Sequence, residues 1–92
     1  MNKIVKWLKN HNINYEISQT GCITILIEKD CIWMNGFGIP MKYDKKITIR
    51  HSKYSGYGVY EQYGYSLTKT IISCKKNELV LEKLKERFEI KD

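Results

Sequence analysis

The spacing of apolar residues changes twice along this 92-residue chain, and these changes constrain its fold more than any other feature. Apolar residues follow helical spacing over residues 2–11, alternation and β-branched runs over residues 13–74, and helical spacing again from residue 77 to about residue 90. A chain of this length has room for one modest core. We therefore expect one α+β domain over residues 1–92, with an N-terminal helix, an antiparallel sheet of four to six short strands, and a C-terminal helix packed on the sheet.

The strand region divides into segments that favour different places in the sheet. Residues 22–27 are β-branched and apolar on both faces, so we expect them to form the central strand, followed by a turn at residues 28–30. Asn35-Gly36 predicts a tight hairpin because both residues accept positive φ, while Pro40 predicts that the return arm is an edge or a loop. Further strands are predicted over residues 13–17, 31–34, 45–50 and 67–74.

The C-terminal helix is predicted to begin after Asn77, which would act as its N-cap, with Glu78 in the first turn. Its apolar residues lie on one face at helical spacing. The residues expected to pack on the sheet are Leu81, Leu84 and Phe88.

The composition fits a globular domain that remains where it is made. Hydrophobic residues make up 42% of the chain, but no apolar run is long enough to span a bilayer. Charges are interleaved too closely over residues 1–7 for a signal peptide, so we expect a cytoplasmic protein without membrane association. The cysteines are odd in number and scattered, which favours reduced thiols over a disulfide framework: Cys22, Cys31 and Cys74.

The chain is basic, with sixteen Lys and Arg residues against ten acidic ones and a net charge of +6. Only two of the basic residues are arginine, the residue best suited to bidentate phosphate and base-edge recognition. The sequence has no alanine and is rich in lysine, isoleucine and asparagine, a pattern typical of AT-rich coding. The charge therefore permits nucleic-acid binding without requiring it.

Residues 50–65 hold five of the seven tyrosines and three of the six glycines. As a strand, this segment places Tyr57 and Tyr63 on one face and Tyr60 on the other. So small a core cannot bury every ring, and exposed rings would stack on bases or press against another protein. The alternative is that the rings form cross-strand pairs and cover the core. The candidate binding residues are Arg50, His51, Lys53, Tyr54, Tyr57, Tyr60 and Tyr63.

Arg50, His51, Lys53 and Tyr54 combine a guanidinium fork, a titratable donor, a point charge and a phenol, a set that can hold a phosphate. The alternative is that these residues are the solvated end of a strand. No glycine-rich phosphate loop precedes a helix here.

The predicted hairpin supplies a second candidate surface, formed by Trp33 and Phe37. Tryptophan, phenylalanine and methionine together within residues 33–41 exceed what a solvated loop needs, and such residues are typical anchors of protein interfaces. The alternative is that the rings fold back on the sheet, which we favour for Trp33 but not for Phe37.

The sequence favours no enzymatic or cofactor chemistry. Cys22, Cys31, His51 and Cys74 include no close pair of the kind that anchors a zinc site. No paired carboxylates and no nucleophile motif accompany either histidine. We therefore expect no metal, no cofactor and no catalytic residues.

Two functions remain open. The first is a non-catalytic protein that binds nucleic acid through an exposed tyrosine-rich strand flanked by basic residues. The alternative is an accessory protein, of the kind found in phages and mobile elements, that docks on a host protein or protein–nucleic-acid complex and inhibits or modulates it, for example in counter-defence. Binding to DNA or RNA should weaken steeply with salt, whereas docking on a protein should not.

Overall fold

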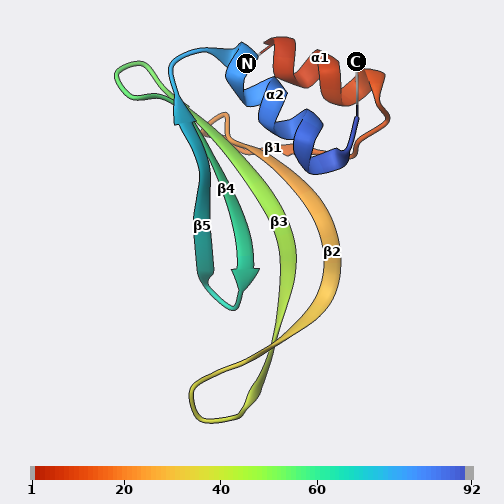
Figure 1. Cartoon of the computed structure of the whole chain (residues 1–92), viewed down its shortest axis with the longest axis vertical. Helices are drawn as coiled ribbons and strands as arrows, with labels where there is room; N and C mark the ends of the chain where they lie inside the picture. Colours follow the sequence, from red (N-terminus) through yellow and green to blue (C-terminus); the bar gives the residue numbers. More distant parts are fainter. Residues whose placement is uncertain (1, 91–92) are drawn as a thin grey trace.

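A computed structural model describes residues 2–90 of the chain. Its elements follow in the order α1 (Asn2–Asn10), β1 (Glu16–Ile17), β2 (Ile23–Met34), β3 (Pro40–Ser52), β4 (Gly56–Gly64), β5 (Leu67–Cys74) and α2 (Asn77–Phe88). The strands form one antiparallel five-stranded sheet in the order β1-β2-β3-β4-β5 (Figure 1). This confirms the predicted α+β fold with a helix at each end of the chain.

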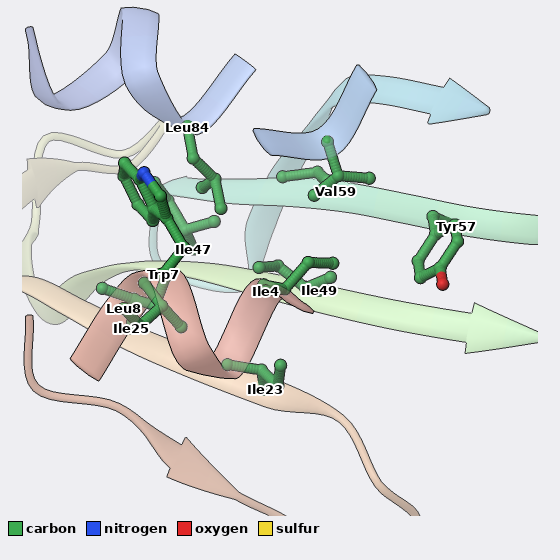
Figure 2. Close-up of a cluster of buried hydrophobic side chains, with 11 residues drawn as sticks. Ile4, Trp7, Leu8, Ile23, Ile25, Ile47, Ile49, Tyr57, Val59 and Leu84 are labelled. Atoms are coloured by element: carbon green, nitrogen blue, oxygen red, sulfur yellow. The ribbon is translucent and has the colours of Figure 1, made fainter. Parts of the chain in front are cut away.

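Both helices pack on one face of the sheet, near the end where β4 begins (Figure 1). Alternation along the strands places five apolar side chains on that face: Ile23, Ile25, Ile47, Ile49 and Val59. The helices cover them with Ile4 and Leu8 from α1 and with Leu84 from α2 (Figure 2). These residues are essentially inaccessible to water and supply most of the hydrophobic stabilisation of the fold.

The contact face of α2 differs in detail from the prediction. Val80 and Leu84, four residues apart on one stripe, are the fully buried side chains of this helix. Leu81 and Phe88 flank that stripe and are half-buried. Asn77 is the first helical residue rather than the N-cap, because the extended backbone that precedes the helix belongs to Lys76.

β3, and not the strand containing residues 22–27, is the central strand of the sheet. β2 lies between β3 and the two-residue strand β1, so most of β2 forms an edge. Residues 28–30, predicted as a turn, belong to β2. The pairing register with β3 shifts on either side of Glu28, and Asp30 has a left-handed backbone (φ 55°). Bulges take up the extra residues, so the strand bends without ending.

The hairpin between β2 and β3 forms where it was predicted, but its turn is different. The positive φ lies at Gly38 (76°) and not at the predicted Asn35-Gly36 pair. The Asn35 side chain caps a longer loop: its Oδ1 accepts the backbone N–H groups of Phe37 (2.8 Å) and Ile39 (3.0 Å). The return arm is part of β3, since Pro40 occupies the first position of that strand, where proline is tolerated.

Neither helix of the described residues is long and apolar enough to cross a membrane. α1 and α2 are instead tied to each other at their N-terminal ends, where the Lys3 Nζ lies 3.4 Å from Oε1 of Glu78. The backbone N–H of Glu78 itself, and then the Lys3 ammonium, hold the pKa of the Glu78 carboxyl below its usual value.

Candidate functional site

The tyrosine segment is divided between the two faces of the sheet. Tyr57 lies on the helix-covered face, is buried, and ends the row of core side chains (Figure 2). The His51 ring packs against it at an interplanar angle of 42°, with 4.4 Å between ring centroids. Tyr60 lies on the opposite face, which no helix covers within residues 2–90, and is half-buried. Tyr57 is therefore a core residue, and Tyr60 faces the open side of the sheet.

Tyr60 lies flat over Gly58, the residue two positions before it on the same face. A Cβ atom at Gly58 would overlap the end of the Tyr60 ring, so only glycine leaves room for this arrangement. The Arg50 guanidinium lies over the same ring, with its Cζ 5.7 Å from the centroid. Gly58, Tyr60 and Arg50 thus form one small surface on the helix-free face.

The remaining candidates of the segment lie elsewhere. Lys53 and Tyr54 are in the turn between β3 and β4, where the Ser52 Oγ accepts the backbone N–H of Tyr54 (3.3 Å), and Tyr54 is 86% exposed. Tyr63 is exposed near the opposite end of β4, about 20 Å from Tyr57 at the rise of an extended strand. The structure therefore does not bring the seven predicted residues together on one surface.

The far end of the β2–β3 hairpin forms an arm, defined here as residues 31–43, that projects beyond the β4–β5 turn (Figure 1). Trp33 lies on its inner side and is half-buried against Gly64: a Cβ atom at Gly64 would lie 3.0 Å from Cδ1 of Trp33. Phe37, at the tip, is 90% exposed. Of the two predicted aromatic residues, Trp33 folds back on the sheet and Phe37 does not.

The outer side of the arm is apolar. Alternation along β2 turns Ile32 and Met34 away from Trp33, and both are more than half exposed. Ile39 adds a third side chain of similar exposure beside the tip. We call these three residues and Phe37 the outer surface of the arm. The sequence-based hairpin surface, residues 33–41, contained Met34 and Ile39 but not Ile32, which the alternation within residues 31–34 could have identified.

A buried carboxylate lies between α2 and the sheet. Oε1 of Glu61 accepts the Nε–H of Arg87 at 2.6 Å, and its Oε2 lies 3.9 Å from the Lys69 Nζ. Nearby, partial burial raises the pKa of the Tyr43 hydroxyl, and Cys31, Glu28 and Glu61 raise it further. Both carboxylate oxygens of Glu61 face cations, and the shallow depression that Glu61 lines is bordered by those same cations, Lys69 and Arg87. Its arrangement is that of a structural ion pair.

Over residues 2–90 no three His, Cys, Asp or Glu side chains come close enough together to hold a metal ion. The three cysteines are free and half-buried. Comparison of the chain with protein-family models, with curated proteins and with solved structures gives no match. Its function is therefore inferred from the arm and the helix-free face.

Proposed function

We propose that this protein is an interaction module that docks on a partner protein through the outer surface of the β2–β3 arm. The observation that carries this proposal is the 90% exposure of Phe37 at a structured tip, beside three aliphatic side chains that are more than half exposed. Clustered exposed apolar side chains of this kind are typical of interaction sites.

The arm presents these side chains in a fixed arrangement. Asn35 holds the tip through its two hydrogen bonds to the backbone, and Trp33 anchors the inner side of the arm on Gly64. Binding to a preorganised surface loses less conformational entropy than binding to a loose loop. Phe37 is therefore suited to act as an anchor that enters a pocket of the partner.

The charge of the chain indicates what kind of partner would fit. No charged residue occurs between Cys31 and Met41, so the contact itself would be apolar. The whole chain carries +6, which steers association towards an acidic surface and opposes the approach of a second copy. We therefore expect the partner to be a protein with an apolar pocket in an acidic surface. Docking of this type would allow the chain to inhibit or modulate that protein, as an accessory protein of a phage or mobile element would.

Nucleic-acid binding on the helix-free face is the second candidate function. It is favoured by the exposed Arg50, for which no carboxylate partner occurs among residues 2–90 and which lies over the Tyr60 ring. A cation beside an aromatic ring on an open sheet face suits a single strand, whose phosphates and bases it would contact. Among residues 2–90, Tyr60 is the one ring recorded beside Arg50, which makes the arm the stronger candidate.

Affinity capture with matched variants tests the docking proposal. The tagged wild-type chain and its Phe37→Ala and Tyr54→Ala variants would be incubated with nuclease-treated host lysate, and the captured protein would be purified for titration calorimetry. Tyr54 is the control because it is an equally exposed aromatic residue at a different turn. We expect Phe37→Ala to weaken binding by about 10–100-fold, as for an interface anchor, and Tyr54→Ala to change it little.

Two results would contradict the docking proposal. One is equal affinity of the Phe37→Ala variant and the wild type. The other is a wild-type dimer in sedimentation experiments that Phe37→Ala dissociates, because the occupant of the outer surface would then be a second copy. Steep weakening with salt, together with loss of capture after nuclease treatment, would favour the nucleic-acid function instead.

A further inference from the structure

A depression lies near the β3–β4 turn, at the opposite end of β3 from the arm. His51 and Tyr57 line it from the helix-covered face of the sheet, and the part considered below opens on the helix-free face. The sheet register aligns three residues of this depression on neighbouring strands, with Arg50 beside Gly58 and Gly58 beside Ser73. The Tyr60 side chain lies over Gly58, and Thr20 and Ser52 are among the other residues that line the depression.

The missing side chain at Gly58 determines where the Tyr60 hydroxyl lies. The end of the Tyr60 ring occupies the space that a Cβ atom at Gly58 would fill. Arg50 and Ser73 flank Gly58 in the register, and the Arg50 Cζ lies 5.7 Å from the centroid of the Tyr60 ring. Both residues therefore neighbour the strand position over which the phenol hydroxyl lies. Three hydrogen-bond donors of different types are thus gathered on one row across the sheet.

The depression is suited to an anion by its charge. None of its lining residues, all within the described part of the chain, is acidic. Of the two arginines, Arg87 is paired with Glu61, whereas Arg50 lies over the Tyr60 ring. An arginine fork surrounded by hydroxyl groups offers charge-assisted and neutral hydrogen bonds to several oxygens of one ligand.

We propose that this depression binds a phosphate group. Arg50 donates two N–H groups to two non-bridging phosphate oxygens, and the hydroxyls of Tyr60 and Ser73 donate to further lone pairs of the non-bridging oxygens. The phosphate belongs to a monoester or to a diester, since both present such oxygens. The inference goes beyond the docking proposal and does not depend on it, because the arm lies at the other end of the sheet. If the ligand is a diester, this site would provide the phosphate contact of the second candidate function, nucleic-acid binding.

Titration by nuclear magnetic resonance at constant ionic strength tests this site. The probes are inorganic phosphate, adenosine monophosphate and a single-stranded oligodeoxynucleotide. We expect each effective probe to shift the backbone amide signals of Arg50, Gly58 and Ser73. Tyr60→Phe, which keeps the ring and removes only the hydroxyl, should weaken binding of phosphate or the monophosphate about tenfold, and Arg50→Lys should weaken it comparably by removing the fork. Lys6→Ala removes a positive charge from an exposed position of α1, whereas neither site variant changes the net charge, and it should bind as the wild type does.

The probes distinguish the two sources of phosphate. Tighter binding of the oligonucleotide than of the monophosphate, with the same amides shifted, supports a diester, and equal binding supports a small phosphorylated ligand. The proposal is overturned if no probe shifts these amides, or if Tyr60→Phe and Arg50→Lys bind inorganic phosphate as tightly as the wild type. If the oligonucleotide binds both variants as tightly as the wild type, the proposed phosphate site is refuted, but nucleic-acid binding elsewhere on the chain remains supported.

Discussion

Replacing Arg87 with methionine should destabilise the fold, because it leaves the buried Glu61 carboxylate without its closest partner. The Glu61 side chain is 7% exposed and receives the Arg87 hydrogen bond at 2.6 Å. Removing one partner of a fully buried ion pair costs about 3–5 kcal/mol. The Arg87 side chain is 33% exposed, and Lys69 remains 3.9 Å from the carboxylate, so we expect a smaller loss. We estimate about 2 kcal/mol for Arg87→Met.

Thermal and urea unfolding of matched variants measures this loss. For a domain of this size, about 2 kcal/mol corresponds to a fall in melting temperature of roughly 8–16 °C. Lys83→Met is the control, because it removes a cation from the same helix but breaks only the exposed pair with Glu86, worth less than about 0.5 kcal/mol. Glu61→Gln combined with Arg87→Met should cost less than the sum of the two single changes by about 1 kcal/mol, since each single change removes the same interaction. Arg87→Met that is no more destabilising than Lys83→Met, or strict additivity in the double variant, would refute the reasoning.

Two further predictions concern packing. Gly64→Val should displace Trp33, because the new Cβ atom at position 64 would lie 3.0 Å from Cδ1 of Trp33. The melting temperature should fall and the Trp33 indole N–H resonance should shift. An unchanged resonance would mean that the arm is not anchored at Gly64. Leu84→Ala should lower the free energy of unfolding in urea by about 2–5 kcal/mol, because the Leu84 side chain is fully buried. Phe88→Ala should lower it by less, roughly 1–2 kcal/mol, because Phe88 is half-buried. The opposite order would show that α2 packs on the sheet through the flank that contains Phe88.

The spacing of apolar residues along the sequence was enough to predict the fold class, because helical spacing and strand alternation each determine which residues share a face. The same alternation assigned Tyr57 and Tyr60 to opposite faces, and the structure places Tyr57 in the core and Tyr60 on the open side. Local turn signals were less reliable. The charged residues 28–30 resemble a turn, but bulges keep them within β2 as it pairs with β3.

The parts of the candidate site that the sequence did not predict depend on contacts between distant residues. Trp33 is held by Gly64, thirty-one positions away, and nothing in the local sequence of either residue indicates the pairing. The burial of Glu61 likewise depends on Arg87, which arrives from the last helix. The sequence favoured an exposed role for Phe37 over a core role, and the side chain is 90% exposed at the hairpin tip, where no helix or strand of residues 2–90 covers it.

Site-specific photo-crosslinking tests the docking proposal most directly. A benzophenone amino acid would replace Phe37 in one variant and Tyr54 in another, since both positions are exposed aromatic residues at turns. After illumination in host lysate, the proposal predicts a covalent adduct to one acidic protein from position 37 and none to that protein from position 54. Adducts of equal yield from both positions, or adducts from position 37 only to a second copy of the chain or to nucleic acid, would contradict it.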